Sequence, residues 1–220
     1  MEQPNEQDIR YTFAHLMLQQ YGVDFVDDLF SADDDIAVHA AEEFSDIFFH
    51  QGDIYPHSAT SVPHLVGALG LVGPGARAEL IHLLAGVATA SNVSGGEARL
   101  ITEATRRVFE RLSALEAYLR DEDDRVRLAA LMSLTDLARI NAPQMQFSRG
   151  RPPFVGAYPE SFEPEAYRQQ LRDLIGGMRD DFDSAWRVNC EAALAYLAFE
   201  APDASRAEQP HPFWAMLERH

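Results

Sequence analysis

Histidine and carboxylate side chains recur at helical spacing between residues 39 and 50. His39, Glu43, Asp46 and His50 are separated by four, three and four positions, so a helix places them in one stripe. An imidazole and a carboxylate one turn apart can chelate a metal ion, which makes His39 with Glu43, or Asp46 with His50, a possible half-site. Because eleven residues span about 16 Å along a helix, the four side chains cannot share one ion.

A second helix would have to supply the missing ligands, and His57 and His64 are the candidates. The simpler interpretation is a solvated polar face beside a buried stripe of Ile36 to Ile47. The neighbouring run Asp33–Asp35 lacks the alternating acids, central glycine and closing glutamate of a calcium loop, and it predicts a helix cap instead. We therefore predict no metal and no cofactor.

Several catalytic chemistries are excluded by residue type. All eighteen basic residues are arginines, so Schiff-base chemistry, a Walker lysine, a kinase strand lysine and a Ser-x-x-Lys acylase are all absent. The chain also has no G-x-S-x-G elbow, no H-E-x-x-H and no paired C-x-x-C. Cys190, the only cysteine, lies in a helical pattern that predicts a buried, inert thiol. We predict no catalytic residues and a protein that is not an enzyme.

The charge is concentrated at one end. The formal net charge is -17, and the first 53 residues hold 13 acids and one base, Arg10. This charge repels phosphate backbones and anionic membranes, so neither nucleic acid nor membrane is an expected partner. It favours a protein partner with a basic surface, although the same acids could serve only as a solubility face. The predicted partner-binding residues are Asp33, Asp34, Asp35, Glu42, Glu43, Asp46, His50, Tyr55, Arg149 and Arg151.

Four stretches carry apolar residues at relative positions 0, 4, 8 and 11, which is one face of a helix. They begin at Ile36, Ala76, Val126 and Trp186. Acidic clusters precede three of them, where carboxylates can cap the helix, whereas Gly73–Gly75 precedes the second. Between them the pattern predicts partner helices and no strand, with helices near 6–20, 23–30, 34–49, 58–69, 76–89, 97–119, 124–140, 164–178 and 184–199.

One all-α domain over residues 1–220 is expected. Two segments interrupt or follow the helices: a Pro-rich loop at 141–162 and a tail at 201–220 that would cap the last apolar face. The loop carries Arg149 and Arg151 among aromatic residues, a composition that suits an interface, or else aromatics that fold back over the helices.

The run Asp123-Asp124-Arg125-Val126-Arg127 resembles the second helix of a HEAT repeat. The segment from His50 to Leu69 resembles bacterial HEAT-repeat proteins that share His-Gln-Gly, Tyr-Pro and Val-Pro-x-Leu. The resemblance covers about residues 10–140. It implies an α-solenoid of stacked antiparallel helix pairs whose surface binds proteins and sometimes nucleic acid, and it implies no activity of its own.

The leading interpretation is a cytoplasmic, non-enzymatic protein-binding module. In its most concrete form it is an immunity-type antidote that masks a basic toxin or nuclease with its acidic surface. The alternatives are an enzyme on a HEAT-like fold, of the alkylbase DNA glycosylase or bilin lyase type, and a scaffold that bridges several proteins. A glycosylase would need arginines of the 99–127 region on one concave face.

Overall fold

The protein is all-α. The computed structural model describes residues 4–22, 25–90, 92–139 and 158–198, which are 72% helical and 3% strand. The helices of this part of the chain are α1 (Glu6–Tyr21), α2 (Val26–Leu29), α3 (Asp34–Phe48), α4 (Ser58–Ala68), α5 (Pro74–Ala88), α6 (Arg99–Phe109), α7 (Leu112–Glu116), the 3₁₀ turn η1 (Ala117–Arg120), α8 (Asp124–Leu137), α9 (Pro164–Met178) and α10 (Ser184–Ala198). Within the described residues, no helix is both long and apolar enough to cross a membrane.

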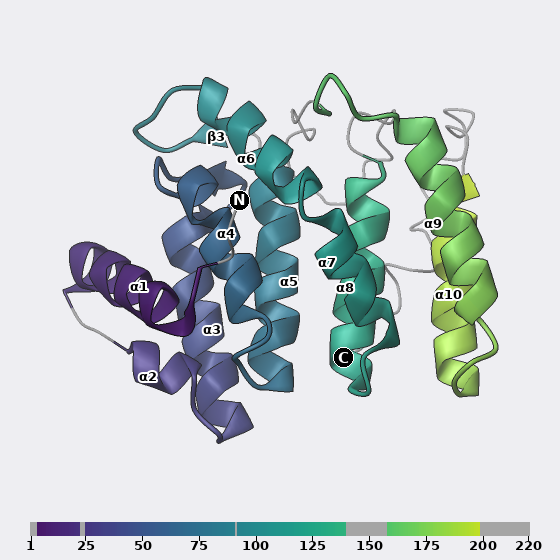
Figure 1. Cartoon of the computed structure of the whole chain (residues 1–220), viewed down its shortest axis with the longest axis horizontal. Coiled ribbons are helices and arrows are strands. Elements are labelled where there is room, and N and C mark those ends of the chain that lie inside the picture. The colour runs from purple at the N-terminus through teal and green to yellow at the C-terminus, as the bar shows by residue number, and fades with distance from the viewer. Residues whose placement is uncertain (1–3, 23–24, 91, 140–157, 199–220) are drawn as a thin grey trace.

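The helices form two layers (Figure 1). In one layer α3, α5, α8 and α10 lie side by side, with α5 packed between α3 and α8, and α10 packed on the far side of α8. The other layer holds α4, α7 and α9, each running opposite to its neighbour in the first layer, and α6, which crosses obliquely over α4 and α5. α1 and α2 cover α3 and α4 at the N-terminal end. We call the first layer the helix row.

The four apolar stretches of the sequence coincide with the four helices of the row. Most of their core positions are buried, as predicted, although Leu194 of α10 is only partly buried. The prediction is wrong at Ile36, which is 46% exposed, because α3 turns the neighbouring Ala37 into the core instead. Cys190 is fully buried in α10, and burial raises the pKa of its thiol to about 12, which agrees with an inert role.

Acidic residues cap three of these helices, as predicted. The side chain of Asp33 accepts hydrogen bonds from the amides of Asp35 and Ile36. Asp123 accepts one from the Arg125 amide at 2.9 Å, and Asp183 accepts one from the Trp186 amide at 2.8 Å. Each carboxylate therefore satisfies orphan amides at a helix start and meets the positive end of the helix dipole.

The glycine-rich start of α5 obtains its carboxylate from another helix. Asp34 of α3 accepts a hydrogen bond from the Gly75 amide at 3.0 Å, and its second oxygen binds the Arg125 guanidinium of α8 at 2.6 Å. A Cβ at position 75 would lie 2.9 Å from the Asp34 carboxylate and would also collide with Val38, so only glycine allows this approach. We call this contact of three helices the Asp34 clamp.

Three two-residue strands correct the prediction of no strand. β1 (Phe49–His50) pairs antiparallel with β2 (Asp53–Ile54), which pairs parallel with β3 (Asn92–Val93). Gly52 takes a left-handed conformation, and with Gln51 it forms a hairpin turn. Helix α3 thus ends at Phe48, which leaves His50 on a strand.

The long helix predicted over 97–119 is divided into α6, α7 and η1. The helix breaks at Arg111, where φ is -118° and ψ is 9°. Buried positions on the two sides keep the spacing of one helix face: Val108 of α6 is followed by Leu112 and Leu115 of α7 after four and seven residues. The apolar pattern therefore continues through the break, which explains why the sequence predicts one long helix here.

Part of the Pro-rich loop packs on the helices. Tyr158 and Phe162 join a cluster with Phe109 and Tyr167, in which the Phe109 and Phe162 ring centroids lie 4.5 Å apart. These two aromatics therefore fold back, as one of the alternatives predicts. Arg149, Arg151 and the 201–220 tail lie outside the described residues.

Candidate partner-binding surface

One face of α3 carries exposed carboxylates. Asp35, Glu42 and Asp46 follow one another at spacings of seven and four residues, and all three are exposed. Among the described residues, none of them forms an ion pair with an arginine. We call these three residues the α3 acidic face. Glu43, beside it on the same helix, is exposed as well.

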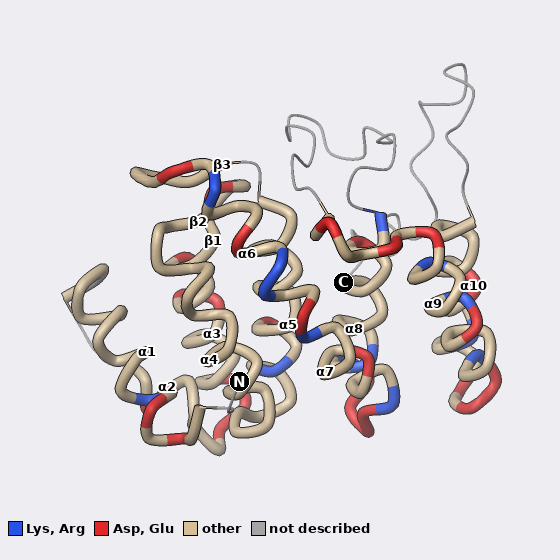
Figure 2. Tube along the Cα trace, turned by 45° about the horizontal axis from the view of Figure 1, so that its top comes forward, with Lys and Arg blue, Asp and Glu red and all other residues tan. Residues whose placement is uncertain are grey.

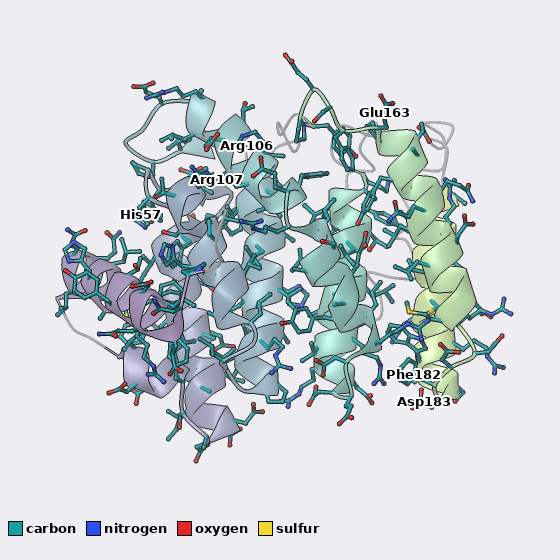
Figure 3. The ribbon with its side chains drawn as sticks, in the orientation of Figure 1. His57, Arg106, Arg107, Glu163, Phe182 and Asp183 are labelled. Carbon is teal, nitrogen blue, oxygen red and sulfur yellow. The ribbon has the colours of Figure 1, made fainter. Side chains whose placement is uncertain are left out.

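Arginines neutralise many acids in the other regions of the described chain (Figure 2). Arg106 and Arg107 of α6 bind Glu103 (Figure 3), and the Arg107–Glu103 contact is 2.6 Å. Arg77 binds Asp121 at 3.0 Å, and Arg120 binds an acid that precedes α10. Near the N-terminus, Arg10 pairs with Glu6 and Asp27. The three carboxylates of the α3 acidic face have no such arginine partner within the described residues.

The polar stripe of α3 does not gather a set of metal ligands. Its members are exposed, as predicted, and the Nδ1 atom of His50 lies 3.1 Å from the Asp46 carboxylate. His57 instead packs under Phe48 and forms a 2.8 Å hydrogen bond with the Ile47 carbonyl. Burial lowers the pKa of this histidine. Within the described residues, no group of three or more His, Cys, Asp or Glu could hold a metal ion.

Tyr55 belongs to a structural corner. Its half-buried ring stacks on His57 with centroids 5.9 Å apart, and its amide binds the Ser58 hydroxyl at 3.0 Å. The Ser58 hydroxyl in turn donates to the Phe48 carbonyl. These bonds hold the turn between α3 and α4, so they fix the position of the C-terminal end of the acidic face.

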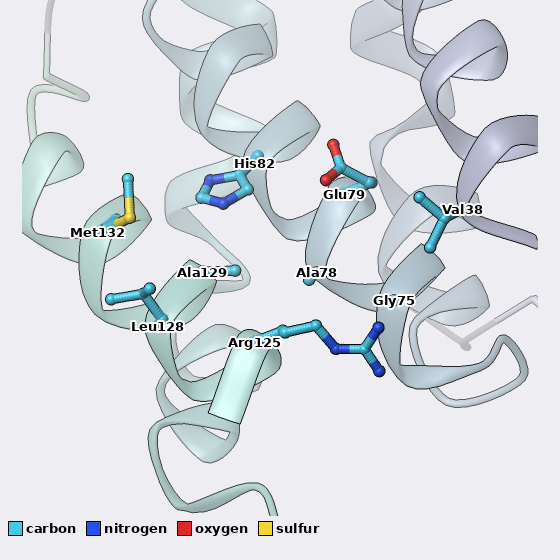
Figure 4. A pocket seen from close by; sticks show the side chains of 9 residues that line it. All are labelled: Val38, Gly75, Ala78, Glu79, His82, Arg125, Leu128, Ala129 and Met132. Carbon is cyan, nitrogen blue, oxygen red and sulfur yellow. The ribbon is translucent and has the colours of Figure 1, made fainter. Parts of the chain in front are cut away.

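A groove opens beside the α3 acidic face, along the helix row (Figure 4). It has a volume of about 260 Å³. α3, α5 and α8 supply its walls, which are mostly apolar with three ionisable groups; the lining residues are Val38, Gly75, Ala78, Glu79, His82, Arg125, Leu128, Ala129 and Met132. We call it the row groove. The Asp34 clamp lies at one end of it and fixes the three helices relative to one another.

The three ionisable groups of the row groove differ in their charge balance. Arg125 binds Asp34 and Asp123, so its positive charge is already compensated. Burial lowers the pKa of His82, which keeps this imidazole neutral at neutral pH. Burial raises the pKa of Glu79, and the nearby Glu42 carboxylate raises it further. Glu79 has no arginine partner within the described residues, so the groove has an excess of negative charge.

Glu79 and His82 are not among the residues predicted from the sequence, although the repeat itself carries the signal. If the four apolar stretches are aligned on their first residues, Glu79 takes the position of His39, and His82 takes the position of Glu42. The structure places both on the outer side of the row, next to the α3 face. Because α3 exposes His39 and Glu42, the residues at the equivalent positions of α5 are candidates for the same binding surface.

Comparison of the chain with protein-family models, with curated proteins and with solved structures gives no match. An exposed carboxylate face beside a partly apolar groove can bind a cationic polypeptide. It offers carboxylates as acceptors and an apolar wall for long side chains.

Proposed function

We propose that this chain is a non-enzymatic, HEAT-like α-solenoid that binds a protein with a basic surface through the α3 acidic face. In the concrete form that we favour, it is an immunity-type antidote that masks a basic toxin or nuclease. The observation that carries the proposal is the set of exposed carboxylates at Asp35, Glu42 and Asp46 with no arginine partner in the described structure. Such a field speeds the capture of an oppositely charged protein.

The helix order supports the HEAT-like part of the proposal. Each helix of the row from α5 onward is preceded by a helix that runs the opposite way, and the pairs follow one another along the molecule (Figure 1). Stacked pairs of this kind are the building units of an α-solenoid. The repeated side of the row then presents equivalent residues from consecutive helices as one binding surface.

The glycosylase alternative receives no support from the arginines of the 99–127 region. Arg106 and Arg107 bind Glu103 on α6, whereas Arg127 is buried under Phe182. Among the described residues of that region, only Arg125 lines the row groove. Its positive charge is compensated by two aspartates, Asp34 and Asp123. A surface that holds DNA needs uncompensated cations on one face.

The experiment begins with affinity capture of the partner from cells that produce the chain, at moderate salt. Stopped-flow mixing then measures the association rate constant of the captured partner with the wild type and with the Asp35→Arg, Asp46→Arg double variant. The proposal predicts that the association rate falls at least about tenfold in the double variant. It also predicts that the wild-type rate falls as salt rises, because salt screens the field to about 8 Å at physiological strength.

A matched control separates a local from a global charge effect. Glu160→Arg with Glu191→Arg changes the net charge by the same amount at two exposed positions, one before α9 and one on α10 at the other end of the helix row from α3. We expect this control to slow association much less. Equal slowing by both double variants would indicate only a general charge effect, and unchanged rates would exclude the α3 acidic face as the binding surface.

A further inference from the structure

The row groove combines an apolar wall with a carboxylate that has no internal counterion. Val38, Leu128 and Met132 line it with half-buried apolar side chains, and Figure 4 shows Met132 and Val38 on opposite sides of it. Glu79 lies between these sides on α5. A ligand that fits must therefore offer both an apolar stem and a cationic end.

The charges around the groove determine which ligand it favours. The Glu79 carboxylate is half-buried and close enough to Glu42 for the two negative charges to interact. The arginine in the groove is bound by Asp34 and Asp123, and the half-buried imidazole of His82 is neutral at neutral pH because desolvation lowers its pKa. The residues of the groove do not supply the missing positive charge, so a bound cation would relieve the repulsion between the two glutamates.

Free anions and neutral apolar ligands fit the groove less well. An anion would face Glu79 and Glu42 and could reach only an arginine that two aspartates already bind. A purely apolar ligand would bury Glu79 further without a hydrogen-bond partner, which costs free energy. Lysine and arginine side chains combine a long aliphatic stem with a charged head that remains at the polar rim.

We propose that the row groove receives a single lysine or arginine side chain of the bound protein, with its charged end between Glu79 and Glu42 and its stem against Met132. This inference rests on the proposed function, because it assigns an anchoring site next to the α3 acidic face. The acidic face would accelerate association, and the groove would slow dissociation once the side chain is inserted.

The test uses peptides as probes and methionine methyl groups as reporters. The full chain is labelled with ¹³C-methyl methionine and titrated with acetyl-Gly-Ser-Arg-Ser-Gly-amide, with its lysine counterpart, and with its citrulline counterpart, which is isosteric but uncharged. Met132→Leu assigns the reporter signal and keeps the wall apolar. Met17 and Met178, both fully buried away from the groove, serve as internal references in the same spectrum.

The inference predicts saturable shifts of the Met132 signal with the arginine and lysine peptides and none with the citrulline peptide. Glu79→Gln should weaken binding of the cationic peptides at least about fivefold, because it removes the charge and keeps the shape. The matched control Glu163→Gln, at the exposed start of α9 (Figure 3), should leave the affinity unchanged.

Three results would overturn the inference: no Met132 shift with either cationic peptide, equal shifts with the citrulline peptide, or equal affinity for Glu79→Gln and the wild type. A difference between the arginine and lysine peptides would identify which cation the groove prefers. The proposed function is tested separately, by the association rate of the captured partner with the α3 double variant. If that rate depends on the α3 acidic face but the peptides do not bind the row groove as predicted, only the anchoring site is wrong.

Discussion

The acids before α3 and the acids before α10 start from the same sequence pattern but meet different surroundings. Before α10, Asp180 binds Arg179 and Arg187, and Asp181 binds Arg120 at 3.1 Å. Before and along α3, Arg125 binds Asp34, whereas Asp35, Glu42 and Asp46 have no arginine partner within the described residues. The comparison teaches that the arrangement of the arginines, more than the position of the acids, decides which acidic cluster remains available to a partner.

Two arginines at equivalent repeat positions extend this comparison. Arg127 and Arg187 each follow the first apolar residue of a stretch. Arg127 is 5% exposed because the next helix pair covers it with Phe182 and Trp186, whose rings lie 4.0 and 5.4 Å from its guanidinium carbon. The side chain of Arg187 remains 52% exposed, since no described helix packs beyond α10.

The largest expected effect is the loss of the buried arginine. Arg127→Ala removes hydrogen bonds to the Asp121 and Glu122 carbonyls and the stacking under Phe182. We expect it to lower the free energy of unfolding by about 3 kcal/mol. Arg187→Ala, its exposed counterpart, should lower it by less than about 0.5 kcal/mol. Urea denaturation monitored by circular dichroism measures the free energy of unfolding of both variants. Equal losses would contradict the claim that Arg127 stabilises the contact between α8 and the next helix pair.

The second effect tests the close approach at the Asp34 clamp. Gly75→Ala places a Cβ against Val38 and the Asp34 carboxylate, so we expect overpacking to lower the free energy of unfolding by about 2 kcal/mol. Gly70→Ala is the matched control, because a Cβ there meets nothing within 4 Å. Its free energy of unfolding should stay within about 0.5 kcal/mol of the wild type. Urea midpoints of the two variants give the comparison directly.

The third effect concerns the charge of the clamp. The hydrogen bonds from Arg125 and Gly75 lower the pKa of Asp34 in the folded protein. Its ionised form therefore stabilises the fold above the unfolded pKa near 3.8, and this contribution is lost as pH falls through the lower folded pKa. We expect Asp34→Asn to lower the free energy of unfolding by about 1 kcal/mol at pH 7. The difference from the wild type should shrink below pH 4 in urea titrations; a constant difference would mean that charge is not involved.

The smallest effect has the opposite sign. The pKa of Glu79 is raised in the folded protein, so its ionised form opposes folding, and this cost disappears as pH falls below its unfolded pKa. We expect Glu79→Gln to raise the free energy of unfolding by up to about 0.5 kcal/mol at pH 7, and to have no effect near pH 3. Thermal melts at the two pH values check this. A loss of stability at pH 7 would indicate a structural role for Glu79 instead of a binding role.

The sequence predicts the helices and their caps better than it predicts the surface. Apolar periodicity locates the row helices, because burial follows the helical repeat, and Asp33, Asp123 and Asp183 act as the expected caps. The break at Arg111 escapes prediction because the helical spacing of the buried residues continues through it from Val108 to Leu115. The hairpin after Phe48 escapes it because strands of two residues leave no detectable alternation.

The candidate site was predictable only in part. The charge count identifies the N-terminal acids, but it does not show that Asp34 is used internally by Gly75 and Arg125. Nor does it show that Glu79 faces the same surface from the next helix. Both facts depend on which helices become neighbours, and contacts between residues about forty and ninety positions apart leave no local pattern.

The most direct test of the central claim is the association rate constant of the captured partner, measured by stopped flow at low and physiological salt for the wild type and for the Asp35→Arg, Asp46→Arg variant. The account predicts that the wild type binds at least about tenfold faster at low salt and that this advantage shrinks as salt rises. Equal rates for the two proteins at both salt concentrations would contradict it, and the acids of α3 would then serve only to keep the surface hydrated.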